Sequence, residues 1–236
     1  MTDIELRNVL SECLPEAILK RNGQLLYSGI ETLRPGDFYF VGFNPAADGT
    51  NPILHKIQLD RRQWSAYKQQ CWSHPHCNET CPKAGQAPHQ KRVRSMMSAL
   101  GLIPERTFAT NLIFVESRNV AEIKKEIRMN GLFEYCWRVH EKILAVVRPK
   151  YIVCLGNGES GSAFSLVRRR AKSIRNVIPG GNKVEGQKHV GLKSFDGTFA
   201  LTNAADLDAR VIGVPHPSRW NCPAGLDDLV YHREMA

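Results

Sequence analysis

Four short apolar runs alternate with longer segments in which apolar residues recur at helical spacing. The runs begin at Phe38, Thr107, Tyr151 and Val211, and polar, glycine or proline residues follow each one. Their aromatic and β-branched residues show no helical period, which is typical of strands buried in a sheet. Strands that alternate with helices indicate an α/β fold. We therefore expect a three-layer sandwich with a central, mostly parallel four-stranded sheet and helices on both faces.

Helical periodicity and local stop signals define the expected helices. They lie at residues 3–20, 59–70, 89–102, 121–129, 132–147, 163–170 and 226–234. Thr2 or Asp3 can cap the first helix, and Asn22-Gly23 ends it. Two extended runs over residues 189–201 flank Asp196-Gly197, a favoured two-residue turn, and predict a hairpin.

Length and composition are those of an ordinary globular protein. At 236 residues the chain is long enough for one sizeable core, so we expect a single domain over residues 1–236. No apolar run reaches the roughly 18 residues that span a membrane, and the first residues lack a secretory signal pattern. Seven irregularly spaced cysteines favour a reducing compartment, the cytoplasm or a eukaryotic nucleus, over a disulfide framework. We expect a monomer with no membrane partner.

The charge balance makes nucleic acid the expected partner. The formal net charge is +9, which fits a protein that meets phosphate, although a basic surface can also serve solubility alone. The run Arg168-Arg169-Arg170 is either a DNA contact or a solvated helix end, and the sequence leaves both interpretations open.

A stretch near residues 71–90 is dense in soft metal ligands. It contains Cys71, His74, His76, Cys77, Cys81 and His89. Thiolate and neutral imidazole are preferred zinc donors, but the spacing Cys-x5-Cys-x3-Cys is not one of the paired patterns of zinc sites. We expect an irregular Cys/His-rich insertion with reduced cysteines and no bound metal. Zinc at Cys71, Cys77 and Cys81 is the alternative.

Polar residues follow or interrupt three of the expected strands. Asn44-Pro45 follows the first strand, Asn111 interrupts the second, and His216-Pro217-Ser218 follows the last. Parallel α/β sheets place their chemistry at the carboxyl ends of strands, so these residues are candidates for a site. The alternatives are a turn-forming asparagine at Asn44, a loop histidine without a ligand at His216, and a buried amide satisfied by the fold at Asn111.

A glycine-rich loop follows the third strand. Gly156-Asn-Gly-Glu-Ser-Gly161 matches the spacing of a dinucleotide-binding turn between a strand and a helix. The strand comes late in the chain, and no acidic residue follows about 20 residues later at the end of a new strand. We expect a helix entry that needs small residues, with a dinucleotide-binding enzyme as the less favoured alternative.

The residues at the strand ends resemble motifs of the uracil-DNA glycosylase superfamily. Gly42-Phe-Asn-Pro45 resembles its first motif, and His216-Pro-Ser218 resembles its second. Thr110-Asn-Leu112 is similar to the position of the asparagine that reads the base, and Tyr151–Gly156 resembles the apolar strand that precedes the second motif. The resemblance covers about residues 38–222, with four short motifs in the family's order, and does not identify a branch.

The resemblance implies a uracil-DNA-glycosylase-like fold and a DNA glycosylase used in DNA repair. Such an enzyme flips uracil or a related damaged base out of the stack and hydrolyses its N-glycosidic bond without a catalytic metal. Asn44 would orient the attacking water, His216 would donate to the base oxygen, and Asn111 would read the base edge. The other residues expected to bind substrate are Gly42, Phe43, Pro45, Ala46 and Asp48. Those expected to contact DNA are Gly156, Ser218, Arg219 and Trp220.

The sequence departs from the family pattern in ways that keep a second reading open. Ala46 replaces the bulky tyrosine that rejects thymine in the most uracil-selective branch, and the region expected to supply a stacking aromatic offers His55, Ile57 and, further on, Trp64. Asp48 either assists the water or caps the turn. The cysteines do not reproduce the spacing of the iron–sulfur branches. The alternative is a catalytically silent nucleic-acid-binding protein on the same fold.

Overall fold

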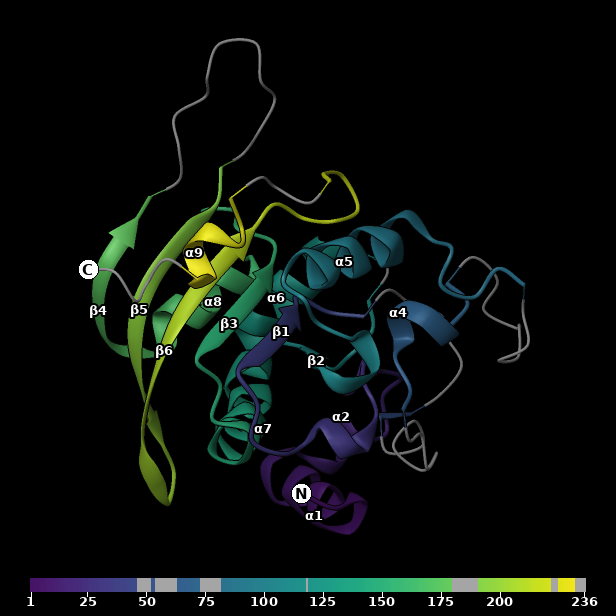
Figure 1. Ribbon diagram of the computed structural model, residues 1–236. Coiled ribbons are helices and arrows are strands. Elements are labelled where there is room, and N and C mark those ends of the chain that lie inside the picture. Colours follow the sequence, from purple (N-terminus) through teal and green to yellow (C-terminus); the bar gives the residue numbers. More distant parts are fainter. Residues whose placement is uncertain are drawn as a thin grey trace.

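A six-stranded mixed sheet forms the centre of the molecule (Figure 1). The computed structural model describes residues 1–45, 52–53, 63–72, 82–117, 119–179, 191–221 and 225–231. The strands are β1 (Phe38–Gly42), β2 (Phe108–Asn111), β3 (Tyr151–Leu155), β4 (Ala171–Ile178), β5 (Lys193–Leu201) and β6 (Ala204–Val214). Their order across the sheet is β2-β1-β3-β6-β5-β4, with β4 at the outer edge.

The parallel half of the sheet confirms the four strands expected from the sequence. β1 pairs in parallel with both β2 and β3, and β3 pairs in parallel with β6. The expectation of four strands was nevertheless wrong, because β4 and β5 extend the sheet on the β6 side in antiparallel pairing. The apolar residues of β4, Ala171, Ile174, Val177 and Ile178, do not alternate with polar ones, and seven of its eight residues are exposed.

The expected hairpin around Asp196-Gly197 is also wrong, because both residues lie inside β5. The turn comes later, at Thr202-Asn203 between β5 and β6, where Asn203 takes a positive φ of 61°. Asp196 is buried and accepts hydrogen bonds from Arg210 (3.1 Å) and from the side chain of Asn176 (2.8 Å). Because side chains of the adjacent strands β4 and β6 supply its hydrogen bonds, Asp196 is accommodated inside a strand and does not mark a turn.

The helices agree with the expected periodic segments. Their bounds are α1 (Asp3–Cys13), α2 (Glu16–Leu19), α4 (Ala66–Gln69), α5 (Pro88–Ala99), α6 (Val120–Asn130), α7 (Leu132–Val147), α8 (Ala163–Arg170) and α9 (Asp228–Tyr231), with 3₁₀ turns at Ile30–Thr32 and Pro104–Arg106. Thr2 caps α1 in a capping box with Glu5. The first helix does not run on to residue 20, because Pro15 separates α1 from α2. The segment expected to be helical from residue 59 is described only from residue 63, and α4 is short.

Both faces of the sheet are covered by apolar side chains. On β1, Tyr39 and Val41 belong to one buried cluster and Phe40 to another, as the period of two in a strand requires. α1, α6, α7 and α8 contribute to the first cluster, and α4, α5 and α9 contribute to the second. This arrangement agrees with the expected helices on both faces. Within the described ranges, no helix is both long and apolar enough to cross a membrane.

The order of the strands creates a switch point between β1 and β3. From β1 the chain passes to β2 on one side, whereas from β3 it passes toward β6, β5 and β4 on the other side. In open α/β sheets the ligand crevice lies at such a point, outside the carboxyl ends of the strands. The topology therefore singles out the ends of β1 and β3 without any appeal to motifs.

A buried histidine ties the longest helix to the carboxyl end of β2. His140 of α7 accepts a hydrogen bond at Nδ1 from the Tyr39 hydroxyl (2.6 Å), and its Nε2–H donates to the carbonyl of Leu112 (3.1 Å). The neutral imidazole satisfies both partners. Burial lowers the pKa of His140 to about 4 from an ordinary value of 6.5.

This histidine should make folding stability depend on acid. Above pH 6.5 the imidazole is neutral in both states; as the pH falls toward 4, only the unfolded chain takes up the proton, so stability is lost in that window. We expect the loss to be about 3 kcal/mol larger in the wild type than in His140→Gln, which can keep both hydrogen bonds but does not titrate. Urea unfolding at pH 7, 5.5 and 4 measures it. Equal pH dependence in the two proteins would contradict this account.

Candidate active site

The candidate residues converge because their strands end at one edge of the sheet. Gly42 is the register partner of Asn111, and Leu155, which precedes Gly156, is the partner of Val214. Asn44 and His216 each lie two residues beyond these rows. Two strand spacings separate β1 from β6, so their strand ends are about 10 Å apart. That distance is suited to a ligand of nucleotide size.

Asn111 occupies the space that a side chain on Gly42 would fill. A Cβ built on Gly42 would lie 2.2 Å from Asn111 Oδ1, so the side chain of Asn111 lies directly over this glycine. Asn111 is 5% exposed, and its Nδ2 has no hydrogen-bond partner in the described part of the chain. A buried amide donor without an acceptor costs about 1–3 kcal/mol. The arrangement is therefore suited to a ligand that brings a carbonyl oxygen.

Asn44 is half-buried and has its amide orientation fixed by its nitrogen. Nδ2 donates to the carbonyl of Pro45 (2.8 Å) and to Ser117 Oγ (3.3 Å). Ser117 Oγ in turn donates to the carbonyl of Asn119, the N-cap residue of α6. Because both bonds use the nitrogen, the Oδ1 end is left as an acceptor, and no donor from the described residues reaches it. An acceptor of this kind can hold a water molecule.

The other residues of the first motif differ in what they can contribute. The side chain of Phe43 is buried in the apolar core, so only its backbone lies at the edge, where its carbonyl accepts from Ile113 N–H (2.9 Å). Pro45 is also buried. Ala46 and Asp48 lie outside the described residues, and their expected contacts with substrate stay predictions.

His216 is oriented by its own loop. Its Nδ1 accepts from the backbone N–H of Ser218 (3.2 Å) and lies 2.7 Å from Ser218 Oγ. Since Nδ1 is an acceptor, the proton of the neutral ring is on Nε2. The ring lies beside Gly156, whose φ of +126° favours glycine; a Cβ there would be 3.6 Å from His216 Cδ2. The geometry leaves a single N–H donor at the end of β6.

The surroundings of His216 favour this neutral form. As a whole residue His216 is exposed, yet protein atoms crowd its ring, and the loss of solvent around the ring lowers its pKa. The positive charge of Arg219 lowers it further. At neutral pH the ring is therefore a hydrogen-bond donor without a positive charge.

The start of α5 contributes two residues that the sequence did not single out for the site. His89 has its ring centroid 5.3 Å from that of His216, with the rings at 70°. Arg92 donates to the carbonyl of Pro217 (2.8 Å) and to Asn221 Oδ1 (3.1 Å). Positions three apart share one face of a helix, which explains why both reach the same loop. The sequence signals were the place of His89 in the Cys/His-rich stretch and the basic residues, Arg92 among them, at the start of the helix that follows.

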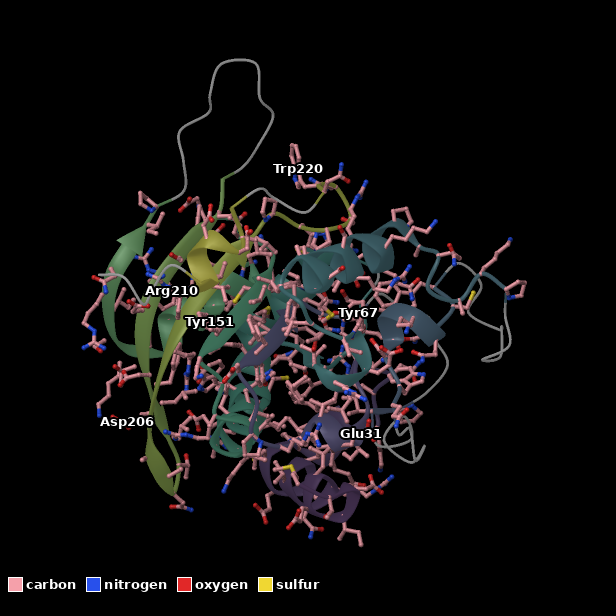
Figure 2. The ribbon with its side chains drawn as sticks, in the orientation of Figure 1. Glu31, Tyr67, Tyr151, Asp206, Arg210 and Trp220 are labelled. Atoms are coloured by element: carbon pink, nitrogen blue, oxygen red, sulfur yellow. The ribbon has the colours of Figure 1, made fainter. Side chains whose placement is uncertain are left out.

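The residues expected to contact DNA lie at the rim of the site. Arg219 and Trp220 both donate their backbone N–H to the carbonyl of His216, and both side chains have access to solvent. Figure 2 shows Trp220 at the outer boundary of the molecule, pointing away from the sheet. The hydroxyl of Ser218 is turned toward His216 rather than outward. Gly156 lies beneath His216, as described above.

The other candidates from the sequence are only partly described. Trp64, a possible stacking aromatic, is 7% exposed and packs in the core, while His55 and Ile57 lie outside the described residues. Cys77 and Cys81 also lie outside, so zinc at this segment stays an open alternative; Cys71 is half-buried. Among the described residues, no group of three or more His, Cys, Asp or Glu side chains could hold a metal.

The glycine-rich loop and the arginine run have local structural contacts. The loop joins β3 to α8 as expected, and its Gly161 approaches Lys124 so closely that a Cβ would lie 2.3 Å from Lys124 Cε. Arg170 pairs with Glu134 (2.6 Å) and lies over the ring of Trp137, which favours a structural role for this member of the run. Arg168 and Arg169 are exposed.

Comparison with known proteins adds no assignment, so the evidence for a function comes from the residues described above. No family model matches the chain, and no curated protein shows significant similarity to it.

Proposed function

We propose that this protein is a DNA glycosylase that extrudes uracil or a related damaged base and hydrolyses its N-glycosidic bond. The observation that carries the proposal is the buried Nδ2 of Asn111, which has no partner among the described residues, at the same strand-end edge as Asn44 and the neutral donor of His216. The resemblance of all three positions to glycosylase motifs supports the same conclusion.

Each of the three groups has a role in this reaction. The oxygen of a water molecule bonds to the anomeric carbon while the bond from that carbon to the base nitrogen breaks, and the electron pair leaves with the base. The proton that the water loses passes to the base anion, directly or through solvent, so the products are the neutral base and an abasic sugar. Asn44 Oδ1 holds the water; an amide is a poor proton acceptor, so its contribution is positioning. His216 Nε2–H donates to the base oxygen as negative charge develops there, an interaction worth about 3 kcal/mol in comparable sites.

Asn111 allows the site to recognise a base by the hydrogen-bonding groups along its edge. Its Nδ2 can donate to a base carbonyl and its Oδ1 can accept from a ring N–H, which is the pattern that uracil presents. The net charge of +9 and the exposed Arg219 favour binding to the phosphate backbone. Trp220, at the rim, is placed to fill the gap that an extruded nucleotide leaves.

The direct test is release of the base from defined DNA. Single- and double-stranded oligonucleotides containing uracil, hydroxymethyluracil, hypoxanthine or mispaired thymine are incubated with the protein, and abasic sites are counted after cleavage. We expect abasic sites with at least one of these bases. DNA binding without base release from any of them would instead favour the silent nucleic-acid-binding protein.

Asn44→Ala should separate chemistry from binding. Removing the acceptor that holds the water should lower single-turnover excision by about a hundredfold or more, with little change in the Kd for undamaged DNA. Ser117→Ala is the graded control, because it removes only the longer of the two hydrogen bonds on Asn44 Nδ2. We expect a smaller loss from it. Equal excision by wild type and Asn44→Ala would contradict the role given to Asn44.

Gly42→Ala should disable recognition through steric displacement. The new Cβ would meet Asn111 Oδ1 at 2.2 Å, so the asparagine must leave its position. We expect excision to fall by about tenfold to a hundredfold and stability to fall by about 1–3 kcal/mol. Gly36→Ala is a matched control, because its Cβ would meet nothing closer than 3.8 Å. The double variant with Asn111→Ala should regain stability but not excision; recovery of excision would contradict the role of Asn111.

A further inference from the structure

The loop that carries His216 is held from outside by one face of α5. Arg92 bonds the loop at two points, the carbonyl of Pro217 (2.8 Å) and the side chain of Asn221 (3.1 Å). One turn earlier on the same face, His89 contacts the His216 ring edge to face, at a centroid distance of 5.3 Å. These contacts join segments about 125 residues apart in the chain. The loop depends on them because its own hydrogen bonds are local.

His89 is in turn held by aromatic neighbours. Its ring stacks on that of Tyr67 at 6.4 Å with an interplanar angle of 9°, and it meets Trp72 edge to face at 5.4 Å. Tyr67 is fully buried in the core and labelled near the centre of Figure 2. Edge-to-face and offset contacts at these distances are favourable. A rigid stack therefore runs from the core of the protein to the ring of His216.

Three contacts together limit the rotation of the His216 ring. His89 lies on one side, Gly156 lies beside Cδ2 (a Cβ there would be 3.6 Å away), and Ser218 bonds Nδ1. A ring flip would exchange Nδ1 with a carbon and break both bonds to Ser218. Burial lowers the pKa of His89 to about 3, helped by His216 and Arg92, so His89 fills its place without charge.

We propose that His89 and Arg92 are positioning residues that hold His216 in the single orientation and tautomer in which Nε2–H faces the crevice. His89 acts through ring contact, and Arg92 acts through the loop backbone. The inference rests on the proposed function only for its effect on rate; the orientation of His216 is a property of the free protein.

Nitrogen NMR of the His216 ring tests the proposal without DNA. In the full-length wild-type protein we expect one set of ring signals, with Nδ1 unprotonated and Nε2 protonated. His89→Ala should give signals averaged between tautomers, and His89→Phe, which keeps an aromatic ring against His216, should restore the wild-type pattern. Unchanged His216 signals in His89→Ala would overturn the role of His89.

Arg92→Met is compared with Lys91→Met, because both remove one positive charge from α5 but only Arg92 bonds the loop. We expect averaged His216 signals in Arg92→Met alone. The same signals in both variants would overturn the role of Arg92. Dispersion of the remaining amide signals shows whether each variant is folded.

Excision kinetics provide the second readout. We expect His89→Ala and Arg92→Met to lower the single-turnover rate by about tenfold to a hundredfold at saturating protein, with recovery in His89→Phe. Lys91→Met should change only the DNA affinity. If the wild type releases no base, the proposed function fails, and the NMR comparison still decides whether α5 positions His216. A rate loss in His89→Ala that His89→Phe does not rescue would overturn the positioning role.

Discussion

The close approach of Asn111 to Gly42 is the constraint on which the rest of the site depends. A Cβ on residue 42 would lie 2.2 Å from Asn111 Oδ1, so any larger residue there would compete with the Asn111 amide for one space. Glycine on β1 gives that space to the amide of Asn111. On the far side, His140 fixes the carbonyl of Leu112, the next residue. The backbone next to Asn111 is therefore fixed, while Nδ2 of its side chain has no acceptor among the described residues.

A second glycine extends the same arrangement across the sheet. Gly42 is the last residue of β1 and Gly156 directly follows β3, and both lack a side chain at the switch point of the topology. The Asn111 amide occupies the space over Gly42 on the β2 side, and the His216 ring lies beside Gly156 on the β6 side. Both glycines therefore leave room for a polar side chain from a neighbouring strand end.

The sequence predicted the parts of this structure that depend on local pattern. Tyr151–Leu155 is a continuous apolar run and Ala163–Arg170 has helical spacing, and the structure has this strand and this helix at the expected residues. β4 could not be predicted, because an exposed edge strand has no hydrophobic alternation. The sequence predicted the candidate residues at the strand ends, but it did not predict the contacts of His89 and Arg92. Those contacts join α5 to a loop far along the chain, and no short-range signal records such a pairing.

The charges around His216 determine whether its ring can act as a neutral hydrogen-bond donor or as a charged acid. An imidazolium would need a carboxylate beside it to raise its pKa, yet the described groups near the ring are the neutral His89 and the cations Arg92 and Arg219. All of them disfavour a second positive charge. In the proposed reaction His216 therefore contributes a hydrogen bond to the departing base rather than a proton. The base leaves as an anion, and the stabilisation depends on how accurately one N–H is placed, which makes the rigidity of the α5 contacts as important as the histidine itself.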